Sequence, residues 1–170
     1  MTGDGGAADS VAAVVTAVRG WQTSSGRQLV VAIDGHGAAG KTTIANLAAG
    51  ELEAILLHTD SYFRDAGPTA PPVPMARYYD WERLRTEALI PALSKAGRAP
   101  LLIEGVSSAS PALADLVTRR ILVWTAEPVR LERLRARISE EEWDETWLAQ
   151  ERLYFATVPP ESFDLVVPGG

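Results

Sequence analysis

The sequence predicts a three-layer α/β fold, in which a parallel sheet of about five strands is flanked by helices. Four short apolar segments alternate with stretches in which apolar residues recur at helical spacing, and a fifth short apolar segment follows near the end of the chain. Strands that are buried on both faces of a parallel sheet read as nearly continuous apolar runs, as these segments do. We therefore expect one domain over residues 1–170.

Each predicted element follows from its local pattern. The apolar runs predict strands at Leu29–Asp34, Ala54–Thr59, Pro100–Val106, Arg120–Ala126 and within 163–170. Helical spacing predicts helices over Asp9–Trp21, Thr42–Glu51, Trp81–Ala96 (with Pro91 as a kink or break), Glu127–Ile138 and from Ser139 to about Ala156. Residues 1–8 are rich in Gly and Ala and are expected to be disordered. Residues 61–79 are rich in proline and lack periodicity, which indicates a long loop.

Composition excludes several classes of protein. The formal net charge of −6 and the pI near 4.9 argue against a nucleic-acid polymer as partner. No apolar run approaches the roughly 18 residues of a membrane span, and the N-terminus lacks the basic and apolar regions of a signal peptide. Cysteine is absent, so disulfides are excluded. We expect a cytoplasmic protein without membrane association; the sequence leaves open whether it forms a homo-oligomer.

The segment GHGAAGKT, residues 35–42, fits the pattern G-x-x-x-x-G-K-[ST] in full. It follows a predicted strand and begins a predicted helix, which is the context in which such glycine-rich loops bind phosphates. The glycines let backbone N–H groups converge on anionic oxygens, and the helix N-terminus adds partial positive charge. The motif therefore predicts a nucleoside-triphosphate site and a P-loop NTPase fold.

The motif also assigns roles within this loop. Lys41 is expected to reach the β- and γ-phosphates, and Thr42 to hold Mg²⁺ through its hydroxyl. The residues expected to bind ATP are Gly35, Gly37, Ala38, Ala39, Gly40, Lys41, Thr42 and Thr43. His36 could touch a phosphate, but an exposed loop histidine without a role is the more frequent case, and we expect His58 to be structural.

Several classes of protein share such a loop. The chain has no N-K-x-D or T-K-x-D element, which weighs against a GTPase, and it has no repeat that suggests a motor or helicase. A small-molecule kinase needs further acids and mobile cations over the transferred phosphoryl group. Asp60 and Glu104 end two predicted strands, so both lie at the sheet edge where ligands bind in open α/β folds. They could hold Mg²⁺ together with Thr42, or Asp60 could accept the proton of the acceptor.

Arginines after the fourth strand are candidates for the mobile cations. Four of them lie within residues 130–137, and they cannot all reach one site. We expect Arg133 and Arg137, which share a helix face at i, i+4 spacing, to close over the phosphates.

Taken together, these residues resemble the uridine kinase and phosphoribulokinase branch of P-loop kinases. The matching elements are AIDGHGAAGKTTIA, HTDSYF, YYDWERL, LLIEGV, AEPVRLERLRAR and W…ER.YF, which follow in the family's order from Val30 to Gly169. The glycine-rich loop is common to many families, whereas D-S-Y-F after the second strand and E-G at the end of the third are more specific.

The resemblance implies transfer of the γ-phosphoryl group of ATP to a hydroxyl of a nucleoside or similar small molecule. It implies that Asp60 is the general base toward that hydroxyl, that Glu104 helps to coordinate Mg²⁺ and that Arg137 is the lid cation. It further implies that Tyr62, Phe63 and Arg64 line the acceptor pocket and that Tyr79 and Asp80 contact the acceptor.

The chain departs from the family in places. The family often has R-D where this chain has Arg137 followed by Ile138, and the N-F-D-H-P element and the β-hairpin over the base have no counterpart. Asp80 could equally be the N-cap of the helix that begins at Trp81. Two other functions also stay open: a nucleoside monophosphate kinase, for which Arg64, Arg77, Arg83 and Arg85 could bind an acceptor phosphate, and a P-loop ATP-binding regulatory protein that phosphorylates nothing.

Overall fold

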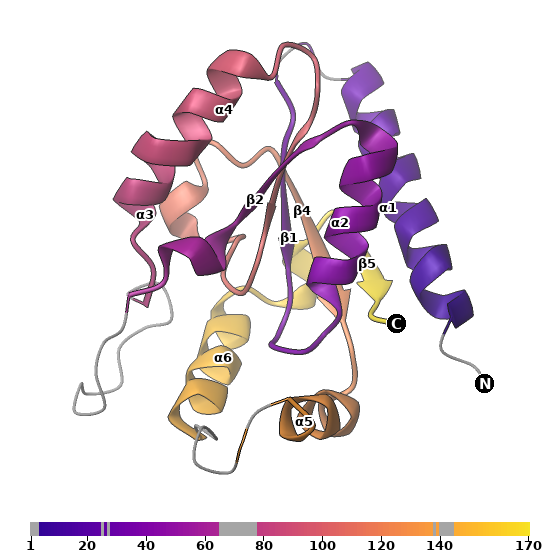
Figure 1. The fold of residues 1–170 in the computed structure, drawn as a ribbon, viewed down its shortest axis with the longest axis vertical. Helices are drawn as coiled ribbons and strands as arrows, with labels where there is room; N and C mark the ends of the chain where they lie inside the picture. The colour runs from indigo at the N-terminus through magenta and orange to yellow at the C-terminus, as the bar shows by residue number, and fades with distance from the viewer. Residues whose placement is uncertain (1–3, 25, 27, 65–77, 138, 140–144) are drawn as a thin grey trace.

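A five-stranded parallel sheet forms the centre of the protein. The computed structural model describes residues 4–24, 26, 28–64, 78–137, 139 and 145–170 (Figure 1). The strands are β1 (Val30–Asp34), β2 (Ile55–His58), β3 (Leu101–Glu104), β4 (Arg119–Trp124) and β5 (Leu165–Pro168), in the order β2-β3-β1-β4-β5. All four pairings are parallel. The predicted fold class is thus confirmed, and the ends of β1, β2 and β3 meet at one edge.

Helices cover both faces of the sheet. On one face, α1 (Asp4–Ser24) and α2 (Lys41–Leu52) pack against alternate residues of β1, among them Val31 and Ile33. On the other face lie α3 (Trp81–Arg83), the π-helical stretch Leu84–Leu89, α4 (Ile90–Lys95) and α6 (Glu145–Thr157). The helix α5 (Glu127–Arg135) lies beyond the carboxyl ends of the strands, next to α6 (Figure 1). Short 3₁₀ turns occur at Thr59–Tyr62, Pro111–Leu113 and Pro160–Ser162.

Several predicted boundaries change in the structure. The first helix begins at Asp4 rather than Asp9, so the expected disorder is wrong for residues 4–8. Pro91 was predicted to kink or break the third helix. The helical run continues from Trp81 to Lys95, so there is no break; the irregularity is the π-helical stretch Leu84–Leu89 that directly precedes α4 and Pro91. The described part of α6 begins at Glu145, and residues 140–144, which hold most of the predicted first turn, lie outside the described residues.

None of the helices in the described part of the chain is long and apolar enough to cross a membrane. The cytoplasmic location stays a prediction.

Candidate active site

The glycine-rich loop joins the central strand β1 to α2, as its motif predicts. All eight residues expected to bind ATP lie in this loop or in the first turn of α2. Gly40 caps α2 with φ 96°, a left-handed conformation that glycine adopts without a Cβ penalty. Gly35 has φ 148°, and a Cβ there would lie 2.3 Å from the carbonyl oxygen of Val123. The loop therefore depends on glycine both for its turn and for its close approach to β4.

Lys41 is held inside the loop. Its side chain is buried, and Nζ donates a hydrogen bond to the carbonyl oxygen of His36 at 2.8 Å. Burial lowers the pKa of Lys41, while the carboxylates of Glu104, Asp34, Glu151 and Asp60 raise it. The ammonium group thus lies among acids and close to the amides at the start of α2, where a phosphate would meet both.

Glu104 connects three elements at the carboxyl edge of the sheet. Its Oε1 accepts a hydrogen bond from the Thr42 hydroxyl at 3.1 Å and lies 3.0 Å from Nδ1 of His58. The side chain is buried, and no donor among the described residues reaches its Oε2. A buried carboxylate oxygen without a partner is costly unless a cation or water binds to it. His58, expected to be structural, is a direct neighbour of this group.

The acids fit a magnesium ion that is held mainly by phosphates. Among the described residues, no group of three or more acidic or histidine side chains forms a ready-made metal site. Mg²⁺ in phosphate-transfer sites is typically bound by one or two protein oxygens, with phosphate and water oxygens as the other ligands. Thr42 and Glu104 provide such a pair, and the unpartnered Oε2 is the oxygen that is open to it.

Asp60 lies in the 3₁₀ turn directly after β2, next to Glu104. A Cβ placed on Gly105 would be 3.5 Å from Oδ1 of Asp60, so the two strand ends touch. Asp60 is open to solvent on one side, but desolvation by its surroundings raises its pKa, and the Glu104 carboxylate raises it further. Lys41 and His58 act in the opposite direction. The structure therefore brings Asp60, Lys41, Thr42 and Glu104 together, as the strand ends predicted.

The predicted acceptor segment is closed by a short antiparallel bridge. Phe63 pairs with Tyr79, the Arg64 N–H donates to the Tyr78 carbonyl at 2.6 Å, and the Asp80 N–H donates to the Tyr62 carbonyl at 2.8 Å. The bridge holds together the two ends of the chain around residues 65–77, which lie outside the described residues. The predicted long loop therefore has paired ends.

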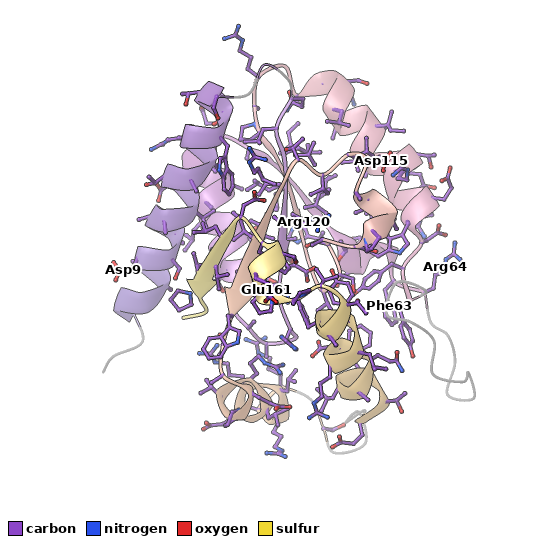
Figure 2. All side chains as sticks on the ribbon, turned by 180° about the vertical axis from the view of Figure 1, so that it is seen from behind. Asp9, Phe63, Arg64, Asp115, Arg120 and Glu161 are labelled. Atoms are coloured by element: carbon purple, nitrogen blue, oxygen red, sulfur yellow. The ribbon has the colours of Figure 1, made fainter. Side chains whose placement is uncertain are left out.

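An aromatic cluster packs behind this bridge. Its members are Phe63, Tyr78, Tyr79, Trp81 and Trp147, with neighbouring ring centroids 5.0–5.9 Å apart. Figure 2 shows Phe63 beside α6, which carries Trp147, and Arg64 farther out on the same flank. The cluster joins the segment after Asp60 to α6. Tyr79 is buried within it, and burial raises its pKa far above the usual range.

Asp80 performs the capping role that was one of its two predicted alternatives. Its Oδ1 accepts the N–H of Arg83 at 3.1 Å, which caps α3, and its Oδ2 pairs with Arg64 at 2.6 Å. The Arg64 hydrogen bond lowers the pKa of Asp80. Contacts of Asp80 and Arg64 with an acceptor stay predictions.

The arginines within and just after α5 differ in whether they contact the glycine-rich loop. Arg130 is buried and donates to the Gly37 carbonyl at 3.2 Å. Arg133 donates to the Ala38 carbonyl at 3.4 Å and to the carbonyl of Gly170. Arg137 lies past the end of α5 and is exposed, and among the described residues no hydrogen bond or ion pair joins it to the loop. Arg130, three residues before Arg133 on the same helix face, was missed, although its spacing could have identified it.

Two buried acids beside the loop were also missed. Asp34, the last residue of β1, accepts backbone N–H groups of Gly35, Ser107 and Ala109 and the hydroxyl of Tyr154. Glu151 of α6 accepts the N–H of Gly37 at 2.7 Å. Asp34 directly precedes the glycine-rich motif, and this position in the sequence could have identified it as a residue of the site. Glu151 belongs to the W…ER.YF pattern, but nothing in its local sequence indicates a contact with Gly37.

His36 differs from its prediction. It is half-buried rather than exposed, and its ring stacks on Phe155 with centroids 4.0 Å apart. Burial lowers the pKa of His36 to about 4, and Arg130 and Lys41 lower it in the same direction. The imidazole is therefore neutral near pH 7 and packs as an aromatic ring.

Comparison with known proteins gives structural relatives only. No family model and no curated protein matches the chain. A possible uridine kinase from Bacillus stearothermophilus superposes with a TM-score of 0.68 at 16% identity, covering 94% of this chain and 97% of the other. A sugar kinase from Janibacter sp. HTCC2649 superposes with a TM-score of 0.60 at 18% identity, covering 82% of this chain and 84% of the other. A candidate fructose transport system kinase from Silicibacter sp. TM1040 superposes with a TM-score of 0.59 at 17% identity, covering 93% of this chain and 98% of the other. The chain thus has the fold of P-loop kinases.

Proposed function

We propose that this protein is a Mg·ATP-dependent kinase that transfers the γ-phosphoryl group to a hydroxyl of a small molecule. The acceptor class that we propose is a nucleoside or a sugar-like alcohol. The observation that carries the proposal is the convergence of Lys41, Thr42, Glu104 and Asp60 at one edge of the sheet. The structural likeness to a possible uridine kinase and to a sugar kinase supports it at the level of the fold.

In this proposal each residue acts on one part of the reaction. The loop amides and Lys41 hold the phosphates of ATP, and Thr42 and Glu104 hold Mg²⁺, which would neutralise charge on the phosphate oxygens. Asp60 aligns the acceptor hydroxyl and accepts its proton as the oxygen attacks the γ-phosphorus. The bond between that phosphorus and the bridging oxygen breaks, and ADP leaves. We assign the cation over the γ-phosphate to Arg133, which already donates to the Ala38 carbonyl of the loop.

The acceptor side supports a neutral alcohol over a monophosphate. A nucleotide acceptor would need arginines free to bind its phosphate. Three of the four arginines suggested for this role are paired with acids: Arg64 with Asp80, Arg83 with Glu87 and Arg85 with Asp115. The fourth, Arg77, lies outside the described residues. Two acids beside the reaction centre, Asp60 and Glu104, also disfavour an anionic acceptor.

ADP release in the presence of different acceptors tests this proposal. The panel contains nucleosides, nucleoside monophosphates, monosaccharides and other small alcohols, each with Mg·ATP. We expect a neutral alcohol to stimulate ADP release above the rate with ATP alone. Stimulation by monophosphates only would identify a nucleotide kinase, and ATP binding without stimulation by any acceptor would identify a regulatory ATP-binding protein.

A further inference from the structure

The backbone of Gly37, in the glycine-rich loop, is held from both sides by one ion pair. The N–H of Gly37 donates to Oε1 of Glu151 at 2.7 Å, while its carbonyl oxygen accepts from Nη1 of Arg130 at 3.2 Å. The same Nη1 lies 3.6 Å from Oε2 of Glu151. Glu151 and Arg130 thus form a ring of contacts around the backbone of a single residue, with one contact on each of its two flanking peptide groups.

This ion pair is buried. The side chain of Glu151 is 1% exposed and that of Arg130 is 5% exposed. Trp147, one turn earlier on α6, donates its indole N–H to Oε1 of Glu151 at 3.1 Å. Oε1 therefore accepts two hydrogen bonds, whereas Oε2, as far as the described residues go, has only the ion pair with Arg130. A buried carboxylate in this position is stable only while its counter-ion is present.

Glu151 lies in an unusual position for an acid, because it contacts a loop that is proposed to bind anions. A carboxylate at this loop would repel a triphosphate unless a cation compensates for it. Arg130 provides that compensation, and the Glu151 charge also acts on Lys41. The two partners come from α5 and α6, which flank the segment with the predicted lid arginine Arg137.

We propose that Glu151 is a positioning residue for ATP binding: it fixes the backbone of the phosphate loop at the N–H of Gly37, and Arg130 serves as its counter-ion. The inference rests on the proposed ATP site. It assigns to Glu151 no contact with substrate. Its role is to keep the first half of the loop in the conformation that lets the following amides and Lys41 meet the phosphates.

The test is direct binding of a non-hydrolysable ATP analogue with Mg²⁺, measured by calorimetry for folded variants. Glu151→Ala removes the acceptor of the Gly37 N–H and should weaken binding about tenfold or more, the size expected for one hydrogen bond to a charged group. Glu151→Gln keeps an oxygen acceptor and should bind within about threefold of the wild type. Arg152→Met is the matched control: it changes the residue next to Glu151 on α6, breaks only an exposed ion pair with Glu127 of α5 and should not change binding.

A second comparison isolates the counter-ion. Arg130→Met leaves the Glu151 charge uncompensated and should weaken analogue binding more than Glu151→Gln does. Adding Glu151→Gln to Arg130→Met removes that charge and should recover part of the lost affinity, a coupling that a double-mutant cycle measures. A purely structural role would lower the melting temperature of these variants without this recovery in analogue affinity.

The inference is overturned if Glu151→Ala, shown by circular dichroism to be folded, binds the analogue as tightly as the wild type. It is also overturned if the double variant binds no better than Arg130→Met. Failure of the proposed function looks different, because the wild type itself would then not bind the analogue, or would bind it without phosphorylating any acceptor.

Discussion

The hydroxyl of Thr42 donates to Oε1 of Glu104 at 3.1 Å, although the two residues are 62 positions apart in the chain. The contact arises because β3 pairs directly with β1, in register Ile33 with Glu104, so that the end of β3 lies beside the start of α2. The two side chains proposed to hold Mg²⁺ are therefore already adjacent. Binding of the metal would require little rearrangement of the backbone.

Glu104→Gln should reduce phosphoryl transfer about 10²-fold or more, the range found when one stabilising group is removed from a transition state. The amide can still accept the Thr42 hydroxyl, so the fold and metal-free ATP binding should persist. The measurement is kcat at saturating ATP as a function of Mg²⁺ concentration, together with the affinity for ATP in the presence of a chelator. An unchanged requirement for Mg²⁺ would contradict the role assigned to Glu104.

Asp60→Asn should lower phosphoryl transfer by about 10²-fold, the lower end for loss of a positioned general base, while ATP binding survives. The raised pKa of Asp60 adds a dependence on pH. The base works only when ionised, so activity should fall as the pH drops through the raised pKa, at a higher pH than for an ordinary carboxyl group. Profiles of kcat/KM against pH would reveal this acidic limb, and wild-type rates in Asp60→Asn would rule out the assignment.

His36 should make stability depend on pH. Its pKa is lowered from 6.5 to about 4 in the folded protein, so the unfolded chain binds the additional proton between these values. Stability from this group is complete above about pH 6.5 and is lost as the pH falls toward 4. His36→Phe keeps an aromatic ring against Phe155 and removes the titration. The difference in unfolding free energy between the two proteins, measured from pH 7 to 4, should shift in favour of the variant; a constant difference would contradict the prediction.

Tyr154→Phe should destabilise the protein by about 1.5–3 kcal/mol, the range for a hydrogen bond to a charged group. The lost contact is the hydroxyl donated to Oδ2 of Asp34 at 2.6 Å, inside the core. Burial raises the pKa of Asp34, so removal of this donor should also make the acid harder to ionise. The free energy of unfolding in urea at pH 7 measures this loss. Tyr62→Phe is the control, because it removes the hydroxyl of a tyrosine that is less buried.

Local pattern was enough to predict most elements of the fold. The strands β1 and β3 are nearly continuous apolar runs because both of their faces are buried, and this burial is visible in the sequence. The strand β2 is only partly buried and β4 is buried only over residues 121–123, but both still contain a short apolar run. Asp60 and Glu104 could be placed at one edge because parallel strands end together. The strand order could not be predicted, since it depends on how the elements pack rather than on any one segment.

The contacts of polar residues on the helices could not be predicted from the sequence, for a related reason. Glu151 is a charged residue in a helix, and such residues usually face solvent; only the placement of α6 against the loop brings it to Gly37. Arg130 was visible in the arginine cluster, but its burial depends on the direction in which α5 leaves β4.

The bridge between Phe63 and Tyr79 fixes the two ends of the segment that we propose to bind the acceptor. Backbone hydrogen bonds fix Arg64 and Tyr78 side by side, and these two residues flank residues 65–77, which lie outside the described residues. The entropy of closing such a loop grows only with the logarithm of its length, so insertions or deletions between these points cost little stability. If the proposed function holds, this segment could therefore change in length between related kinases while the glycine-rich loop keeps its place in the fold.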